Sequence, residues 1–282
     1  MKTMNRPSFA WKLYIAAFYL FLFAPLLIVA IFAFNASPFP SPPWRGFTLE
    51  WFTGSGSVFG KPGILMDPIW LDSIGNSFKV AVPVALLAVL IGTVNAWVLE
   101  RAEFPGKTVL AMMMLWPLVI PGVVLGISIL AFFSRVANGL EDWLQTDLDM
   151  LRPGLPLVVL GQLSFILTIA TLIIAARLRK FDRSLEEAAF DLGASRARVL
   201  RTVTLPFLSP ALIGAGLVAL LMSFENFNTT LMLVGSDAPL PITMYGQMRE
   251  GATPAINAVS LLLMLGVGGI ASVFALTSKA GR

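Results

Sequence analysis

Long apolar runs alternate with short polar segments along the whole chain. Six runs are long enough to be membrane helices, at 13–34, 78–99, 108–133, 155–176, 207–234 and 256–277. A helix needs about 20 mostly apolar residues to cross a hydrocarbon core of about 30 Å. No stretch alternates every second residue as a membrane β-strand does. The pattern predicts an all-α membrane protein in which residues 1–282 form a single domain with six transmembrane helices.

The first predicted span follows a basic start that contains Lys2, Arg6 and Lys12. That start resembles a signal peptide. The apolar run is too long for a signal peptide, however, and no A-x-A-like cleavage site follows it. We therefore expect a retained helix.

The basic residues predict the orientation of the spans. Fourteen of the 20 Lys and Arg residues fall in the two tails and in the loops 100–107 and 177–206. The opposite loops hold five: Arg45, Lys61, Arg135, Arg152 and Arg249. The positive-inside rule then places both termini in the cytoplasm. The loop 35–72, rich in Pro, Gly and Trp, is expected to form a partly ordered cap on the outer face.

Composition excludes several classes of protein. The chain is 57% hydrophobic and 13% charged, whereas a soluble domain is about half apolar and about a quarter charged. It has no Cys and no His, which removes disulfides, Cys/His zinc sites, thiol nucleophiles and histidine bases. The net charge of +4 fits cytoplasmic loops rather than nucleic-acid binding. We expect no catalytic residue, no metal site and no nucleic-acid partner.

Nucleotide binding by this chain is also not expected. A phosphate-binding loop needs G-x-x-x-x-G-K-[ST]. The G-K-T run at 106–108 has Arg101 where the first glycine should be, and Gly60-Lys61 is followed by Pro62. No cofactor is therefore assigned to the chain itself.

The loop 177–206 carries the most informative pattern. Ser184 and Glu187 form an S-x-x-E capping box that predicts a helix start, and Gly193 fits its end. The apolar face of that helix consists of Leu185, Ala188, Ala189 and Leu192. A second short helix is expected from Ser195, with Pro206 in the first turn of the next span. Such a hairpin fits a groove on another protein or a layer of lipid headgroups equally well.

The same loop resembles the EAA loop of ABC importer permeases. That pattern is E-A-A, three residues, G, nine residues and I-x-L-P, and only Val203 departs from it. Weaker matches to the family are G-F-T-L-E-W-F at 46–52, N-S at 76–77, F-P-G-K at 104–107 and P-L-V-I-P-G at 117–122.

The resemblance implies a type I importer permease fold in a bacterial inner membrane. It implies a second permease as a heterodimeric partner, two ATPase subunits that bind ATP and Mg, and an extracytoplasmic solute-binding protein. The permease itself is then not an enzyme. The loop 177–206 becomes a coupling helix docked in a cleft of the ATPase. The residues carrying that role would be Glu187, Ala188, Ala189, Gly193, Leu205 and Pro206.

Later motifs bear on the solute. Ser223-Phe224-Glu225-Asn226 and the stretch 241–258 resemble spermidine/putrescine-type permeases, above all their C subunit. A carboxylate at mid-span costs about 2.5–3.5 kcal/mol and is normally functional. Polyamines are cations that a carboxylate, amides and aromatic faces can hold. The candidate substrate path is Glu225, Asn226, Phe227 and Asn228.

Alternatives remain open at this stage. Glu225 can instead pair with a basic residue of the partner subunit, and Asn226 stands where the subgroup often has a second acid. The solute can be an opine, iron(III) or thiamine. A stand-alone secondary carrier, with its basic loop on membrane lipid, is the rival class. Asn95 and Gln162 lie within spans and are expected to hydrogen-bond between helices.

Overall fold

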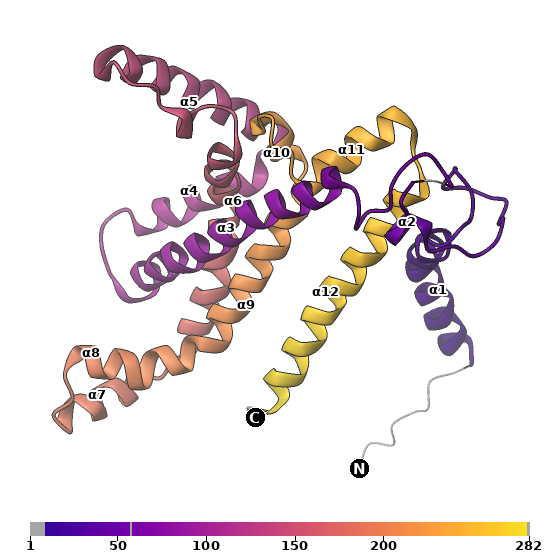
Figure 1. The fold of residues 1–282 in the computed structure, drawn as a ribbon. Helices are drawn as coiled ribbons and strands as arrows, with labels where there is room; N and C mark the ends of the chain where they lie inside the picture. The colour runs from indigo at the N-terminus through magenta and orange to yellow at the C-terminus, as the bar shows by residue number, and fades with distance from the viewer. Residues whose placement is uncertain (1–8, 57, 281–282) are drawn as a thin grey trace. The chain divides into compact units, whose positions relative to one another are not determined.

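The computed structural model describes residues 9–56 and 58–280, and the elements of this part of the chain are helices joined by loops (Figure 1). The helices are α1 (Phe9–Phe32), α2 (Glu50–Thr53), α3 (Pro68–Arg101), α4 (Lys107–Val119), α5 (Gly122–Leu144), α6 (Leu155–Leu178), α7 (Ser184–Asp191), α8 (Arg196–Val199), α9 (Leu205–Phe224), α10 (Asn228–Leu233), α11 (Leu240–Gly251) and α12 (Pro254–Ala280). A 3₁₀ turn, η1 (Asp149–Leu151), and a π turn, η2 (Leu200–Thr204), complete the described elements.

Five helical segments in the described part are long and apolar enough to cross a membrane. They are α1, α3, α5, α6 and the continuous run from Arg196 to Phe224. The all-α class is therefore confirmed. The number of six spans and the cytoplasmic position of both termini stay predictions.

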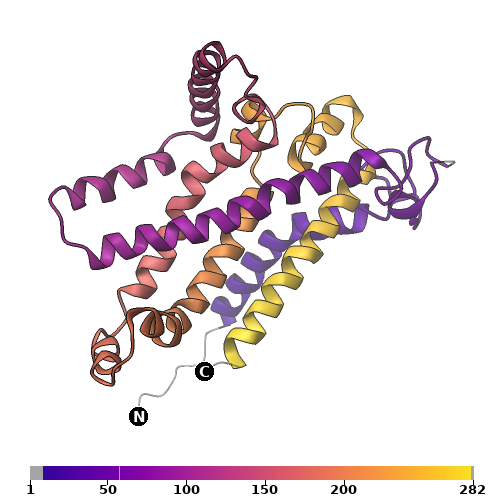
Figure 2. The ribbon, with the colours of Figure 1, turned by 60° about the vertical axis from the view of Figure 1, so that its left-hand side comes forward.

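The third predicted span, 108–133, is wrong as a single helix. The chain leaves the helical conformation at Ile120, with ψ at 129°, and α5 begins only after Pro121. Proline has no N–H to donate and disfavours the helical conformation in the residue before it. The chain turns sharply between α4 and α5 (Figure 2).

The fifth predicted span, 207–234, is also corrected. Pro206 lies in the first turn of α9, as predicted, and the second short helix runs on through η2 into α9. The Leu205 N–H bonds to the Leu200 carbonyl, five residues back, which makes the turn a π turn. Since Pro206 cannot donate to the carbonyl four residues before it, a widened turn at this point is the expected adjustment. At its other end the span breaks at 225–227, between α9 and α10.

The described chain divides into two compact units, 72–243 and a unit of 1–71 with 244–282, and the single-domain boundary of the prediction remains untested. The core of the first unit lies around α6, which packs against α9, α10 and α4. Its fully buried members include Val84, Ile166, Ala170, Ile174 and Leu233. Small residues bring the helices close: a Cβ on Gly92 would lie 3.2 Å from the Thr171 nitrogen.

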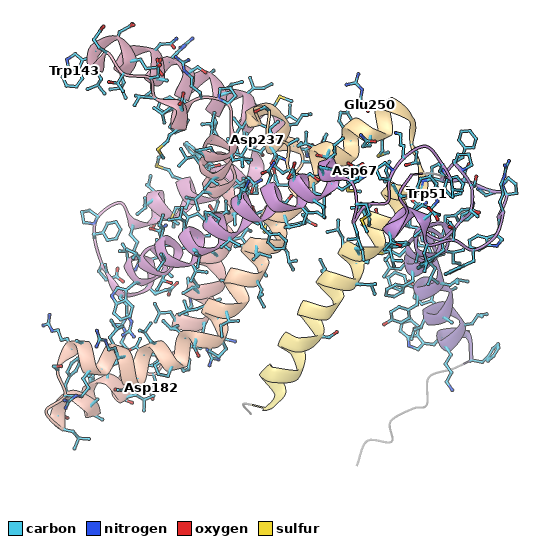
Figure 3. The ribbon with its side chains drawn as sticks, in the orientation of Figure 1. Trp51, Asp67, Trp143, Asp182, Asp237 and Glu250 are labelled. Carbon is cyan, nitrogen blue, oxygen red and sulfur yellow. The ribbon has the colours of Figure 1, made fainter. Side chains whose placement is uncertain are left out.

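The second unit pairs α1 with α12 and contains the folded loop that follows α1. The Trp51 side chain is 1% exposed, and its Nε1 donates to the Asn35 carbonyl at 2.9 Å (Figure 3). The Phe34 ring stacks on Phe47 and Phe52, each with ring centroids 5.1 Å apart. This loop is thus ordered around its aromatic residues. No residue of α1 is buried, as expected for a helix that faces lipid or another subunit.

Candidate functional site

The start of α7 differs from the predicted capping box. The Asp182 carboxylate, not the Ser184 hydroxyl, caps the helix by accepting the Ser184 N–H at 3.0 Å (Figure 3). Hydrogen bonds from the Ser184 backbone and side chain lower the pKa of the Asp182 carboxyl. Glu187 is exposed and has no side-chain bond within the part of the chain that the structure describes. The Glu187 carboxylate is therefore available to a partner.

Gly193 ends α7 as the sequence predicts. Its φ is +80°, a conformation that glycine adopts without the steric penalty of a Cβ. The Gly193 N–H bonds to the Phe190 carbonyl at 2.8 Å, and the Ala194 N–H to the Ala189 carbonyl at 3.0 Å. These two bonds form a Schellman motif, which turns the chain tightly toward α8.

The apolar face of α7 is uncovered. Leu192 is 89% exposed, Leu185 is 52% exposed, and Ala188 is exposed. Only Ala189 is half-buried among the predicted face residues. An exposed apolar face on a short helix outside the predicted spans favours a protein interaction site. The other two predicted coupling residues, Leu205 and Pro206, begin α9 directly after the π turn η2.

Glu186, which the sequence reasoning missed, anchors α7. The Arg101 guanidinium donates to its carboxylate through Nη1 at 3.0 Å and Nη2 at 3.2 Å. The Thr204 hydroxyl donates to the same carboxylate at 2.7 Å. Arg101 also lies over the Trp97 and Phe181 rings, at 5.1 and 5.3 Å from their centroids. The Arg101–Glu186–Thr204 cluster thus joins α7 to the end of α3 and to η2.

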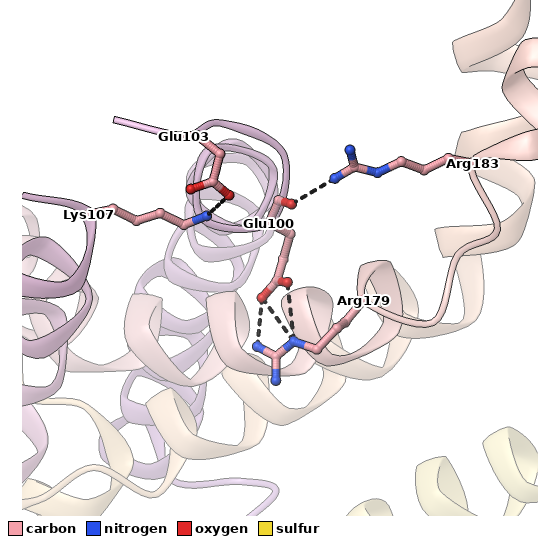
Figure 4. Close-up of polar contacts among 5 residues, drawn as sticks. All are labelled: Glu100, Glu103, Lys107, Arg179 and Arg183. Atoms are coloured by element: carbon pink, nitrogen blue, oxygen red, sulfur yellow. Dashed lines mark hydrogen bonds and ion pairs between the residues drawn. The ribbon is translucent and has the colours of Figure 1, made fainter. Parts of the chain in front are cut away.

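A second ion pair joins α3 to the end of α6. The Arg179 Nη2 lies 2.6 Å from a Glu100 carboxylate oxygen, and Arg183 donates to the Glu100 carbonyl at 3.1 Å (Figure 4). The Glu100 hydrogen bond raises the pKa of Arg179 above its ordinary value. Arg177 donates to the Phe207 carbonyl at 3.1 Å. Because these three arginines bond to their own chain, they hold the loop to the ends of α3 and α9.

The candidate substrate path lies at the break between α9 and α10. The Asn226 side chain accepts from the Thr230 N–H at 3.2 Å and from its hydroxyl at 3.0 Å. Gln162 of α6, 1% exposed, donates to the Thr230 hydroxyl at 2.8 Å and accepts from the Ser223 hydroxyl. The prediction that Gln162 bonds between helices is confirmed. These bonds hold both sides of the break against α6.

Glycines on the neighbouring helices let α10 approach closely. A Cβ on Gly161 would lie 2.1 Å from a Leu233 methyl carbon, and one on Gly126 would lie 2.9 Å from the Met232 Cβ. The Thr229 hydroxyl donates to the Gly122 carbonyl at 3.3 Å. The broken segment is therefore packed tightly between α5 and α6, and its geometry is fixed.

The four predicted path residues separate into two groups at this break. Asn226 serves the fold, and Phe227 is half-buried. Glu225 and Asn228 are exposed. Glu225 directly follows the last residue of α9, where the carbonyl end of a helix attracts positive charge. The break therefore exposes a carboxylate and an amide beside a helix end suited to a cation.

The chain is similar to inner-membrane permeases of known transport systems. Residues 88–280 match the family described as binding-protein-dependent transport system inner membrane component. The chain is 33% identical over 261 residues to the putrescine transport system permease protein PotI of Escherichia coli K12, covering 92% of the chain and 87% of PotI. It is 28% identical over 254 residues to the spermidine/putrescine permease PotC of that strain, covering 89% and 87%.

Two further similarities widen the comparison. Over 189 residues, 64% of the chain and 81% of the relative, it is 34% identical to the molybdenum permease ModB of Escherichia coli K12. In structure it resembles a chain of a bacterial ABC transporter that imports the acidic polysaccharide alginate. The TM-score is 0.65 at 13% identity, with 95% of this chain and 94% of that one covered. The similarity to the alginate importer shows that the chain has the fold of an ABC importer permease.

Proposed function

Because the chain belongs to the family of binding-protein-dependent transport system inner membrane components, we propose that it forms half of the translocation path of an ATP-driven importer for a small organic cation. It is an ABC importer permease of the inner membrane. A second permease, two ATPase subunits holding ATP and Mg, and an extracytoplasmic binding protein complete the proposed assembly. The chain itself then has no catalytic residue and binds no cofactor.

In this proposal α7 is the coupling helix. Glu187, Ala188 and Ala189 contact a cleft of the ATPase, and Gly193 sets the turn that presents them. The supporting observation is that α7 leaves its apolar face and the Glu187 carboxylate uncovered while Glu186 fixes it to the rest of the chain. Leu205 and Pro206 contribute by shaping the junction between the loop and α9.

The proposed solute is a polyamine of the putrescine or spermidine type. The family alone does not select it, since one relative is named for molybdenum and others for polyamines. Glu225 favours a polyamine over an oxyanion as the solute, because a carboxylate at the carbonyl end of α9 attracts a cation and repels an anion. Glu225 and Asn228 line the path, while Asn226 and Phe227 shape the break.

The test is solute-stimulated ATP hydrolysis by the reconstituted importer. Binding proteins loaded with putrescine, spermidine or molybdate are added to the complex in lipid vesicles. Stimulation by a polyamine-loaded binding protein supports the proposal, and stimulation by molybdate alone refutes the cation assignment. Polyamine uptake in vesicles without ATP would instead favour the secondary carrier.

A further inference from the structure

A cavity of about 330 Å³ lies between α3, α4 and α6, away from the break and from the face of α7. Its walls are mostly apolar and include Ala111, Met114, Leu115, Leu172 and Ala175. Leu115 and Leu172 are 42% and 45% exposed, so the cavity opens sideways onto the apolar surface of the helices. A slot of this kind is accessible from the hydrocarbon of a bilayer.

The two threonines at the inner end of the cavity already have hydrogen-bond partners. The Thr168 hydroxyl donates to the Met114 carbonyl at 2.7 Å and joins α6 to α4 there. The Thr171 hydroxyl donates to the Leu167 carbonyl of its own helix at 2.8 Å. Among the described residues, every buried side-chain nitrogen and oxygen has a hydrogen-bond partner. This interior suits a hydrocarbon chain better than water or a polyamine.

Charged residues gather at the other end of the cavity. Glu100, Lys107 and Arg179 line it, and Figure 4 shows Glu103 and Arg183 beside them. Arg179 uses Nε and Nη2 on Glu100, so its Nη1 is left to bond elsewhere. The Lys107 ammonium donates one of its three N–H groups to the Glu103 carboxylate at 2.9 Å. Three cations against two carboxylates leave this rim positive.

The length of the slot matches one bilayer leaflet. Thr168 and Arg179 are eleven residues apart on α6 and its end, which is about 16 Å at about 1.5 Å per residue. Half of a hydrocarbon core of about 30 Å is about 15 Å. With the orientation set by the basic loops, the charged rim falls at the cytoplasmic headgroups and Thr168 near the bilayer centre.

We propose that this cavity binds one anionic phospholipid of the cytoplasmic leaflet. Its phosphate lies beside Lys107 and Arg179, and one acyl chain lies along Met114, Leu115 and Leu172. Basic pockets between membrane helices on the cytoplasmic side are suited to anionic headgroups. A lipid bound here would stabilise the packing of α4 against α6. It would lie beside the C-terminal end of α3, where Arg101 bonds to Glu186 of α7.

The test measures lipid that stays bound to the assembled importer, purified in detergent and exchanged with phosphatidylglycerol or phosphatidylcholine. The wild type should retain phosphatidylglycerol about tenfold better than phosphatidylcholine. Lys107→Gln with Arg179→Gln should abolish that preference. Leu115→Trp should lower retention of both lipids by filling the slot. The matched control, Arg196→Gln with Arg198→Gln, removes two exposed cations from α8 and should leave the preference intact.

Inorganic phosphate separates a lipid site from a site for a free anion. Phosphate at millimolar concentration should not displace the lipid, because it cannot replace the acyl-chain contacts. Displacement by phosphate would overturn the proposal, as would equal retention of the two lipids by the wild type. Absence of bound lipid from the complete complex would mean that the partner permease covers the cavity and would also overturn it.

Discussion

The Arg101 guanidinium and the Glu186 carboxylate, 85 positions apart in sequence, form two hydrogen bonds at 3.0 and 3.2 Å. Their side chains are 13% and 15% exposed, so solvent screens the pair only partly. Among the described side chains of α7, Glu186 alone forms an ion pair. The orientation of the proposed coupling helix therefore depends on this pair.

Replacing Arg101 should uncouple the importer without preventing its assembly. Arg101→Met leaves the Glu186 carboxylate with Thr204 alone and should destabilise the loop by about 1–3 kcal/mol. The apolar face of α7 is unchanged, so the ATPase should still co-purify. Solute-stimulated ATP hydrolysis should fall several-fold while basal hydrolysis stays near the wild-type rate.

Three further variants check that this effect belongs to the Arg101–Glu186–Thr204 cluster. Arg198→Met removes an exposed arginine from α8 and should behave as the wild type. Thr204→Ser keeps the hydroxyl on Glu186 and should retain coupling, whereas Thr204→Val should lose part of it. Equal stimulation in Arg101→Met and the wild type would show that α7 does not depend on Glu186.

Gly193 should not accept a side chain. With φ at +80°, Gly193→Ala forces a left-handed conformation on an L-residue, which costs about 1–2 kcal/mol. The tight turn should open and reduce co-purification of the ATPase. Gly139→Ala is the control, because a Cβ there meets no atom within 4 Å and its φ is not positive. Unchanged co-purification with Gly193→Ala would argue against α7 as the docking element.

Substitutions of Gln162 and Glu225 should affect different properties, the first stability and the second transport. Gln162→Leu leaves the buried Ser223 hydroxyl without its acceptor and the Thr230 hydroxyl with Asn226 alone. It should lower stability by about 1–3 kcal/mol, measured as thermal unfolding of the purified complex. Glu225→Gln should leave stability unchanged, because the exposed carboxylate has no partner within the described chain. Polyamine uptake by Glu225→Gln should drop about tenfold or more.

The alternative role of Glu225 gives a different result in the same variant. If Glu225 pairs with a basic residue of the partner permease, Glu225→Gln strands that charge and weakens the heterodimer. Intact assembly with normal uptake would remove Glu225 from the path altogether.

The start of α7 should loosen in acid. The pKa of Asp182 is lowered in the folded state, because its carboxylate accepts bonds from Ser184. The contribution of this cap to stability is therefore fully present above the pKa of the unfolded state and is lost as the pH falls through the lower pKa of the folded state. The rate of amide hydrogen exchange in α7, corrected for the intrinsic pH dependence of exchange, should be constant from about pH 5 to 8. The corrected rate should rise below about pH 4. Asp182→Asn should remove this step, and an identical acid response in that variant would refute the assignment.

Local patterns predicted the features that depend on neighbouring residues. The spacing from Glu187 to Gly193 gave the helix, its exposed face and its glycine end, because these follow from helical periodicity and φ. The capping residue moved by two positions, from Ser184 to Asp182, because both side chains are good caps and only the fold chooses between them.

The helix breaks and the remote contacts were beyond the sequence pattern. Hydrophobicity is continuous across Pro121, so a composition window sees one span where the structure has two helices. The break at 225–227 falls in the polar run 223–230, which the prediction kept inside one span. Glycines at 126 and 161 reveal the close approach of α10 only once their partners are known. The sequence does not reveal the role of Glu186, because its partner Arg101 is remote in sequence. The neighbouring residue, Glu187, is the glutamate of the family motif.

The most direct test of the central claim is cross-linking of α7 to the ATPase. The chain has no native cysteine, so Ala188→Cys gives a single reactive site on the exposed face. In sealed cells an impermeant thiol reagent should label Asp237→Cys but not Ala188→Cys. In the purified complex, Ala188→Cys should form a cross-link with the ATPase subunit that Gly193→Ala weakens. Labelling of Ala188→Cys from outside, or no cross-link in a complex that hydrolyses ATP in response to solute, would contradict the account.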